Sequence, residues 1–150
     1  MKALVQRVSS AEVTVGGEAV GRIGQGILVL AGFGRSDGEK DLKWMTRKLT
    51  SLRIFPDNNR DMNLSVIDVE GSILLVSQFT LHADTRKGNR PGFSKAAPPE
   101  EAEMLYELLF EMLSSTGVPV QTGSFGAMME VSLMNDGPVT IMLNSPSEED

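Results

Sequence analysis

The hydrophobic and polar positions at the start of the chain follow the pattern of β-strands joined by tight turns. Residues 2–15 carry apolar and β-branched side chains at intervals that favour a strand. Gly16-Gly17 then signals a tight turn, and residues 18–23 are expected to form the returning strand. The continuous apolar run 27–31 follows another glycine-rich turn. Connections this short cannot cross over between parallel strands, so the pattern predicts an antiparallel meander.

Two later stretches show the period of amphipathic helices. Apolar residues over 39–53 recur at helical spacing, and a turn at Pro56 ends the segment. A second helix should begin after Pro98-Pro99, because proline is favoured in the first helical turn, and Gly117 should end it. Each segment presents one apolar face, so both helices are expected to cover a sheet.

The remaining strands are short apolar runs or alternating segments. A short strand is expected at 64–69, a buried central strand at 72–79 and another short strand at 118–122. Alternation over 129–134 and 139–143 predicts two half-buried strands. No linker or repeat interrupts the 150 residues. The sequence therefore predicts a single-domain α+β fold, with antiparallel β-sheets in two layers flanked by two main α-helices.

The connection between the last two predicted strands, Asn135-Asp136-Gly137-Pro138, does not fit an ordinary hairpin turn. Asp-Gly is typical of a two-residue type I′ turn, which is closed by the N–H of the residue after the glycine. Pro138 has no N–H, so this closure is unavailable. One solution is a cis Gly137–Pro138 bond, a form taken by about 5–6% of X–Pro bonds. The other is a longer loop with a trans bond, which that frequency favours.

Composition narrows the possible chemistry. The chain has no cysteine and one histidine, which excludes disulfides, a cysteine nucleophile and a two-histidine metal site within one chain. The lack of cysteine is compatible with a reducing cytosol. We expect no membrane contact, because no apolar run reaches the roughly 18 residues that a spanning helix needs. The net charge of −6 argues against a general nucleic-acid binder, but not against a protein that grips only an RNA end.

The predicted central strand ends in the polar run Ser77-Gln78-Phe79-Thr80. Hydroxyl and amide groups at this point lie where a packed sheet opens to solvent. A turn-rich loop follows, which carries the cations Arg86, Lys87 and Arg90. Polar groups beside a cationic loop suit an anionic substrate, such as one that bears phosphate. The same three cations are equally consistent with a solvated loop.

Two stretches together resemble motifs of the D-aminoacyl-tRNA deacylases, the D-tyrosyl-tRNA(Tyr) deacylase family. The run Ser77-Gln78-Phe79-Thr80 is similar to the Ser-Gln and Thr positions of one motif. The run from Asn135 to Thr140 is similar to the Gly-cisPro motif. The likeness extends to residues 89–93 and to the opening residues 1–8. It therefore covers nearly the whole chain, with both motifs in the expected order.

The resemblance implies an enzyme that hydrolyses the ester between a D-amino acid and the 3′-terminal adenosine of tRNA. It also implies activity on glycine that is wrongly attached to tRNA. The expected enzyme is a cytoplasmic homodimer with D-aminoacyl-tRNA as its substrate and with no metal or cofactor. By position, Ser77, Gln78, Phe79 and Thr80 would line the pocket for the adenosine and the ester. The loop cations Arg86, Lys87 and Arg90 would meet phosphates of the acceptor stem.

The resemblance also assigns a role to the unusual turn. Gly137–Pro138 would be cis, would enter the partner subunit's pocket and would accept the substrate's α-amino group on its backbone carbonyls. Arg7 resembles the residue that orients this dipeptide, and Phe125 and Met129 lie in a region that lines the pocket in similar proteins. A stiff backbone would reject one enantiomer sterically. Such rejection can exceed the roughly 1–3 kcal/mol that one methylene provides in a pocket.

Two accounts of the catalytic step remain open at Thr80. In a general acyl-ester hydrolase, Thr80 would be the nucleophile and His82 its base, because residues i and i+2 of a strand share a face. Asp84 would then orient His82. The family resemblance instead implies help from the 2′-hydroxyl of the terminal ribose, with backbone N–H groups near Phe79 and Thr80 stabilising the oxyanion. A homo-oligomeric binding module without turnover is a third class.

Overall fold

One long strand, β1 (Lys2–Val15), organises the sheet because it pairs on both of its edges. The computed structural model describes residues 1–146. The first half of β1 pairs antiparallel with β3 (Gly26–Gly32), and its second half pairs antiparallel with β2 (Glu18–Ile23). On its other edge it pairs antiparallel with β8 (Glu130–Asn144). The predicted antiparallel pairing of neighbouring strands is confirmed for β1, but the predicted meander is wrong. β3 runs in the same direction as β2 and pairs with β1, not with β2.

The other side of the sheet contains parallel strands. β6 (Ser72–Ser77) pairs in parallel with β3, and β7 (Val120–Thr122) pairs in parallel with β6. Parallel pairing requires a crossover connection, and the two helices supply it. Helix α1 (Glu39–Ser51) lies between β3 and β6 in the chain, and α2 (Pro99–Ser114) lies between β6 and β7. The predicted α+β class is confirmed, although the sheet is mixed and not antiparallel throughout.

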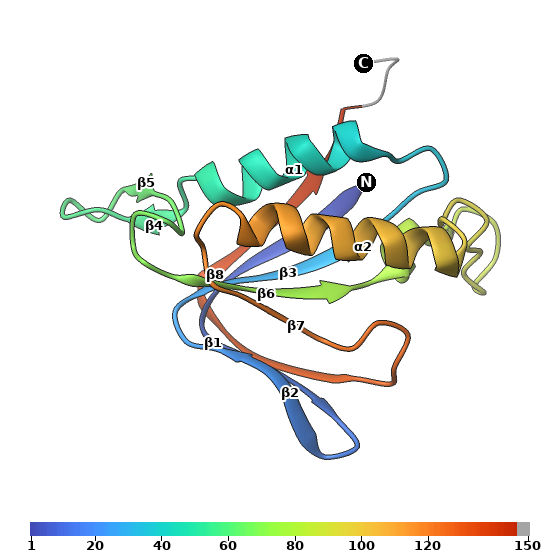
Figure 1. The fold of residues 1–150 in the computed structure, drawn as a ribbon, viewed down its shortest axis with the longest axis horizontal. Coiled ribbons are helices and arrows are strands. Elements are labelled where there is room, and N and C mark those ends of the chain that lie inside the picture. The colour runs from blue at the N-terminus through green and yellow to red at the C-terminus, as the bar shows by residue number, and fades with distance from the viewer. Residues whose placement is uncertain (147–150) are drawn as a thin grey trace.

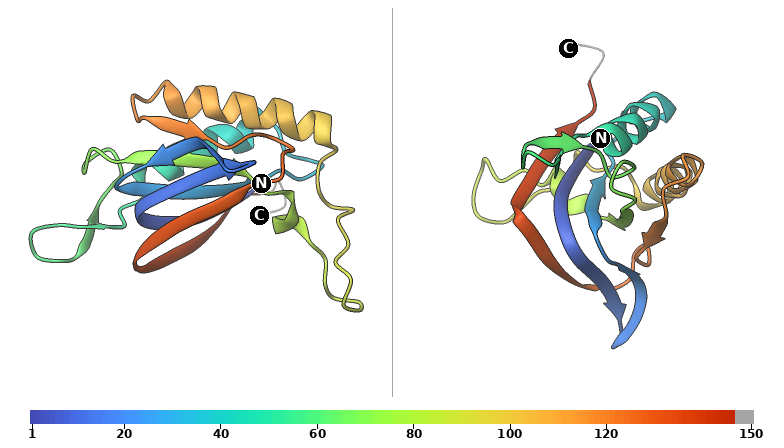
Figure 2. Two further views of the ribbon diagram at one scale, coloured as in Figure 1. Left: turned by 90° about the horizontal axis from the view of Figure 1, so that it is seen from below. Right: turned by 90° about the vertical axis from the view of Figure 1, so that its left-hand side faces the viewer.

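The two helices lie side by side on one face of the sheet (Figures 1 and 2). Between helices and sheet lies the main core, formed by fully buried apolar side chains that include Leu42, Leu49, Leu109, Leu113, Val5, Ile27 and Ile73. Each such side chain contributes about 1.5–3 kcal/mol through removal of its apolar surface from water. Neither helix within residues 1–146 combines the length and the apolar character needed to cross a bilayer.

The opposite face of the sheet encloses a second, smaller core. The sheet curls until β2 approaches β7, so closely that a Cβ added to Gly21 would lie 2.3 Å from the carbonyl oxygen of Thr122. Leu74 and Val76 of β6 point into this second core, while Ile73 and Leu75 point into the first. Burial on both faces explains why β6 is a continuous apolar run and not an alternating one.

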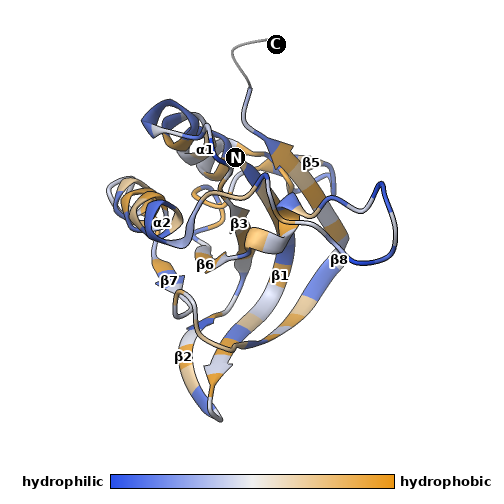
Figure 3. Cartoon of the chain, turned by 90° about the vertical axis from the view of Figure 1, so that its right-hand side faces the viewer, coloured by the Kyte–Doolittle hydropathy of each residue, from blue (hydrophilic) through white to orange (hydrophobic). Residues whose placement is uncertain are grey.

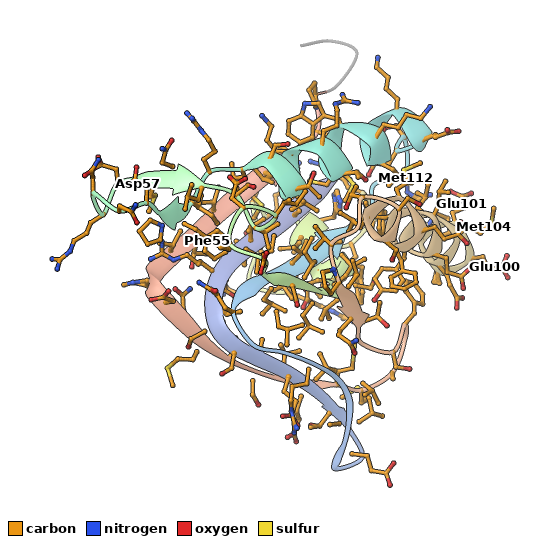
Figure 4. All side chains as sticks on the ribbon, turned by 60° about the vertical axis from the view of Figure 1, so that its left-hand side comes forward. Phe55, Asp57, Glu100, Glu101, Met104 and Met112 are labelled. Atoms are coloured by element: carbon orange, nitrogen blue, oxygen red, sulfur yellow. The ribbon has the colours of Figure 1, made fainter. Side chains whose placement is uncertain are left out.

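Two predicted strand boundaries are wrong. β6 ends at Ser77, and the following residues form a 3₁₀ helix, η1 (Phe79–His82), so Phe79 and Thr80 lie beyond the strand. The strand expected at 64–69 is reduced to β5 (Met62–Leu64), which pairs with β4 (Phe55–Pro56) in a hairpin that projects from the body near Asp57 (Figure 4).

The physical cause of the second error is local. The N–H of Ser65 donates to the Asp68 carboxylate at 2.8 Å, and the N–H of Asp68 donates to the Ser65 hydroxyl at 3.2 Å. Side chains that bond nearby backbone in this way offer an alternative to the sheet ladder. The segment after Leu64 is therefore a turn, in spite of its apolar residues.

The two strands predicted near the C-terminus are one strand, so the separate turn or loop expected between them is not formed. Both halves of β8 pair with β1, as in Ala11↔Leu133 and Val5↔Ile141. While β1 advances from Gln6 to Val8, β8 spans the whole interval between Thr140 and Asn135. Residues 136–139 therefore leave the ladder as a large bulge. Apolar and polar residues alternate in the same way on the two sides of a bulge as on the two sides of a turn. The sequence pattern alone therefore does not distinguish a bulge from a turn.

Candidate active site

The bulge of β8 is held by Arg7, which stands opposite it on β1. The side chain of Arg7 is buried, and the residue is 9% exposed. Its Nε donates to the carbonyl of Asp136 at 2.8 Å, and its Nη1 donates to the carbonyl of Ile54 at 2.6 Å. The same Nε lies 3.6 Å from the Asp136 carboxylate. A planar guanidinium that spans two carbonyls fixes the direction of the bulge relative to the body of the protein.

Asn135 closes the bulge from within. The N–H of Val139 donates to Asn135 Oδ1 at 2.7 Å, and Asn135 Nδ2 donates to Thr140 Oγ1 at 2.9 Å and to the Val139 carbonyl at 3.3 Å. The side-chain amide thus supplies the closure that Pro138 cannot provide. Asn135 was not among the predicted site residues. Its presence just before Asp-Gly-Pro is the signal that could have identified it, because asparagine side chains commonly close backbone turns.

The tip of the bulge is the exposed dipeptide Gly137–Pro138, and the bond between these residues is cis. The trans alternative is therefore not realised. Gly137 has φ of 144°, and a Cβ added there would lie 2.8 Å from Val139 Cγ2 and 3.1 Å from Arg7 Nη2. Only glycine therefore fits position 137 without rearrangement of the neighbouring atoms. The bulge presents main chain, and no long side chain, at its tip.

The polar run Ser77-Gln78-Phe79-Thr80 lies at the edge where the parallel strands β3, β6 and β7 all end. The N–H of Gln78 donates to the Ala31 carbonyl at 2.8 Å, which fastens the run to β3. Gln78 Nε2 donates to the hydroxyl of Thr80. Phe79 is 54% exposed, and the edge of its ring meets the ring of Phe93 at a centroid distance of 5.1 Å. This segment offers an aromatic surface beside an amide and two hydroxyls.

The alternative relay from Thr80 through His82 to Asp84 is not formed. A 3₁₀ helix has three residues per turn, so Thr80 and His82 do not share a face of η1. The His82 ring lies instead against Gly32 and Gly34, with ring carbons 3.2 Å from the position of a Cβ on either glycine. His82 Nε2 is buried and has no hydrogen-bond partner in the described part of the chain.

The carboxylate of Asp84 is bound by Arg86 of the cationic loop. Arg86 donates to its carboxylate through Nε at 2.9 Å and Nη2 at 2.6 Å, and this hydrogen bonding holds the pKa of Asp84 well below its usual range. Backbone bonds between Asp84 and Gly92 close the loop. The other two predicted cations, Lys87 and Arg90, are exposed and form no ion pair with any residue of 1–146. Contact of these cations with phosphate stays a prediction.

Phe125 and Met129 lie in the loop that follows β7. Thr122 pairs with Leu75, so this loop leaves the sheet at the same edge as Ser77. The ring of Phe125 lies 5.7 Å from the ring of Tyr106, and the N–H of Ser124 donates to the sulfur of Met129 at 3.4 Å. The loop that carries both predicted residues therefore begins at the edge of the sheet where the polar run lies.

Tyr106 supports that loop and was missed by sequence reasoning. Its hydroxyl donates to the Leu75 carbonyl at 2.7 Å, and burial raises the pKa of Tyr106 to about 12. A tyrosine at an apolar position of an amphipathic helix gives no sign of its partner, which lies 31 residues away in the sequence. Within residues 1–146, no three acidic or histidine side chains gather closely enough to hold a metal ion.

The bulge and the polar run lie far apart in one chain. The bulge is level with Arg7, which pairs with Ile27, which in turn pairs with Ile73. Ser77 lies four residues further along β6, and β8 and β6 are separated by β1 and β3. Four residues correspond to about 13 Å along a strand, and three strand spacings to about 14 Å across the sheet. The register therefore places Ser77 about 20 Å from the bulge along the sheet.

Comparison with known proteins links both motifs to one family. A family model described as D-Tyr-tRNA(Tyr) deacylase matches residues 4–144. Among curated relatives named D-aminoacyl-tRNA deacylase, that of Chlorobaculum parvum is 56% identical over 149 residues, covering 99% of this chain and 100% of the relative. That of Anaeromyxobacter dehalogenans is 57% identical over 145 residues, covering 97% of each chain.

Two solved structures share the fold of this chain. One described as "c-Myc DNA Unwinding Element Binding Protein" superposes with a TM-score of 0.94 at 49% identity, covering 98% of this chain and 100% of that chain. Another, described as a probable eukaryotic D-amino acid tRNA deacylase, shares the fold with a TM-score of 0.81 at 21% identity, covering 95% of this chain and 97% of that chain. The chain therefore belongs to the D-Tyr-tRNA(Tyr) deacylase family and is a hydrolase that acts on the ester bond of aminoacyl-tRNA.

Proposed function

We propose that the protein removes D-amino acids from tRNA as a homodimer in which the bulge of each subunit completes the pocket of the other. The observation that carries this proposal is the strand register, which places Ser77 about 20 Å from Gly137–Pro138 within one chain. Groups so far apart cannot act on one aminoacyl ester. A two-fold axis brings each bulge to the other subunit's pocket and generates two equivalent sites.

The surface of β8 supports association with a second copy. β8 is paired with β1 alone among the described strands, so it forms an edge of the sheet. Hydrophobic positions alternate with hydrophilic ones along it (Figure 3), and several are exposed: Leu133 at 36%, Met134 at 64% and Met142 at 45%. A long edge strand with exposed apolar side chains is stabilised when another chain covers it.

Selection by handedness follows from a rigid main-chain tip. Arg7 and Asn135 fix the bulge through five hydrogen bonds, so the carbonyls at its tip have one direction. When these carbonyls accept the substrate's α-ammonium group and the pocket holds the ester, the side chains of the two enantiomers must point in different directions. One direction leads to open space and the other into the bulge. Glycine has no side chain to be rejected, so glycine on tRNA is a substrate too.

The catalytic step uses water and the substrate's own ribose. Water adds to the ester carbonyl carbon, the bond to the ribose 3′-oxygen breaks, and that oxygen takes up a proton with the adjacent 2′-hydroxyl as hydrogen-bond donor. The N–H groups of Phe79 and Thr80 open the first turn of η1 and have no partner within it, so they are available to the developing oxyanion. Thr80 positions the ester, since its hydroxyl accepts a bond from Gln78 and contacts no base. No metal or cofactor takes part.

Kinetic assays with an altered enzyme and with an altered substrate test this account of the chemistry. Thr80→Ala is expected to keep most of its kcat/KM on D-aminoacyl-tRNA, because the hydroxyl positions and does not attack. A tRNA that ends in 2′-deoxyadenosine is expected to be cleaved far more slowly than the ribose form. Single-turnover rates on D- and L-aminoacyl-tRNA provide the reference, with rapid release of the D-amino acid only. An inactive Thr80→Ala enzyme with a normally cleaved deoxy substrate would establish Thr80 as the nucleophile.

Complementation between two inactive variants tests the shared site. Gly137→Val blocks the bulge, and Phe79→Glu places a negative charge where the terminal nucleotide binds. Each homodimer is expected to be inactive. Mixed dimers contain one site with a wild-type pocket and a wild-type bulge, so co-refolding equal amounts should restore about a quarter of the wild-type activity. Activity that stays at zero in verified mixed dimers contradicts the cross-subunit arrangement.

Because aminoacyl-tRNA is the substrate, we expect the enzyme to act in the cytoplasm.

A further inference from the structure

The two helices on the sheet carry opposite charge on their outward faces. α2 has five glutamates and no lysine or arginine, and Glu100 and Glu101 point away from the body of the protein (Figure 4). α1 instead carries the cations Lys40, Lys43, Arg47 and Lys48 against two acidic residues, Glu39 and Asp41. A protein with net charge −6 therefore has a basic helix beside a strongly acidic one.

The basic helix borders a cleft of about 440 Å³, which we call the α1 cleft and which is lined by Trp44, Arg47, Lys48, Ser51, Leu52 and Arg53. Lys48 Nζ lies 5.3 Å from the centroid of the Trp44 ring, and Arg53 Nη1 donates to the neutral Asn63 side chain at 3.1 Å. Within residues 1–146, no carboxylate pairs with Arg47, Lys48 or Arg53.

Two exposed cations elsewhere on the surface are compensated by carboxylates. Lys43 pairs with Glu39 at 3.1 Å, and Arg22 pairs with Glu12 at 2.7 Å. The α1 cleft thus gathers three positive charges without internal compensation around an aromatic ring. Phosphate groups are the natural partners of such cations, and a base can stack on the face of a tryptophan.

The α1 cleft is tied through the chain to the bulge. Arg53 directly precedes Ile54, whose carbonyl accepts the hydrogen bond from Arg7. In the proposed dimer, on which this step rests, the bulge enters the partner subunit's pocket. The α1 cleft of one subunit then lies beside the pocket of the other, outside the space occupied by the aminoacyl ester. Lys87 and Arg90 of the subunit that provides the pocket approach the same substrate from another direction.

We propose that the α1 cleft binds the sugar-phosphate backbone of the tRNA acceptor end while the ester occupies the partner subunit's pocket. Arg47, Lys48 and Arg53 neutralise phosphates, and Trp44 stacks on an unpaired base. The acidic outer face of α2 repels the same polyanion, so the charge difference between the helices sets the direction in which tRNA crosses the dimer.

Trp44 is the only tryptophan in the chain, so its fluorescence reports directly on the cleft. Addition of uncharged tRNA to the wild-type protein should change this fluorescence in a saturable manner that weakens with salt. In Arg47→Ala/Lys48→Ala/Arg53→Ala, the midpoint should shift by about tenfold or more, and the slope of log affinity against log salt should fall by about 2–3. The single variant Lys48→Ala should lower this slope by about 1.

A charge-matched control separates the cleft from net charge. Lys40→Ala/Lys43→Ala/Arg60→Gly removes three exposed cations outside the cleft, and glycine suits position 60 because Arg60 has φ of 66°. This control should bind tRNA within about twofold of wild type, apart from the weak long-range term. An equal loss in both triple variants, or no loss in the cleft variant, overturns the proposal. So does duplex DNA that competes as strongly as tRNA at equal charge.

Two substrates separate failure of this inference from failure of the proposed function. The cleft variant should raise KM for D-aminoacyl-tRNA about tenfold with kcat unchanged, and it should cleave D-aminoacyl-adenosine, which lacks the acceptor strand, at the wild-type rate. An equal loss on both substrates means that the cleft supports the fold or the pocket, and it overturns the inference. If wild type cleaves neither substrate, the proposed function fails, while the fluorescence titration still decides whether the cleft binds tRNA.

Discussion

Arg7 connects the core of the protein to the exposed bulge through hydrogen bonds. It occupies an interior position on β1, between Val5 and Val8, which are both fully buried. A charged group at such a position costs free energy unless hydrogen bonds compensate for the lost water. The carbonyls of Asp136 and Ile54 provide this compensation. An apolar side chain at this position would add to the core, whereas Arg7 fixes the direction of Gly137–Pro138 by hydrogen bonds.

Replacement of Arg7 by methionine tests this role, because methionine has similar length and no donor. Two carbonyls lose their donor, so the free energy of unfolding should fall by about 1–3 kcal/mol for each that stays buried. The preference for D- over L-aminoacyl-tRNA should fall as well, since the bulge loses its fixed direction. Urea denaturation and paired kinetic assays measure the two effects. The control Arg22→Met, on the exposed surface of β2, should change stability by less than about 0.5 kcal/mol and leave selectivity unchanged.

The elements of this fold differ in how far the sequence determines them. Segments 2–15, 39–53 and the helix after Pro98-Pro99 were predicted because burial on one face leaves a local period. The parallel partners of β6 could not be predicted, because pairing depends on where a crossover helix returns the chain. The continuity of β8 was missed because its evidence lies in β1, more than a hundred residues earlier.

The candidate site also has features that the sequence predicts and features that it does not. The residue types of the polar run and of Gly137–Pro138 were available from the sequence, because chemistry and backbone restriction belong to single residues. The relation between Thr80 and His82 was left open by the sequence, because it depends on the strand ending at Ser77 and a 3₁₀ turn beginning two residues later. Closure of the bulge by the Asn135 side chain was missed, although an asparagine just before Asp-Gly-Pro is a signal for such a closure.

Asn135→Ala tests that closure at the level of the strand. The variant removes three hydrogen bonds and leaves the N–H of Val139 without its acceptor, so it should lower the free energy of unfolding by about 2–3 kcal/mol. Asn135→Asp keeps the acceptor for Val139 and should lose less. The control Asn144→Ala changes the same residue type at the exposed end of β8 and should be nearly neutral. Equal stability of Asn135→Ala and Asn144→Ala would show that the bulge needs no side-chain closure.

At the scale of the whole molecule, Tyr106 joins the helix layer, the sheet and the site. It belongs to α2, its hydroxyl donates to the Leu75 carbonyl on β6, and its ring lies against Phe125 in the loop beside the polar run. Because burial disfavours the tyrosinate, ionisation of this side chain is linked to global unfolding. The attachment of α2 to the sheet therefore depends on pH in the alkaline range.

Tyr106→Phe reveals this linkage by a reversal of the stability order. Folding raises the pKa of Tyr106 from 10.0 to about 12, so the stability that its neutral form contributes is fully present below pH 10 and is lost as the pH rises towards 12. Near neutral pH the variant should be about 1 kcal/mol less stable, because it lacks the hydrogen bond to Leu75. Above about pH 10 the wild type should lose this advantage, by on the order of 3 kcal/mol over the full interval. Tyr106 is the only tyrosine, so the ultraviolet absorbance of tyrosinate in the native protein gives an independent measurement. Parallel stability curves for the two proteins, with ionisation near pH 10, would show that this hydroxyl is open to solvent.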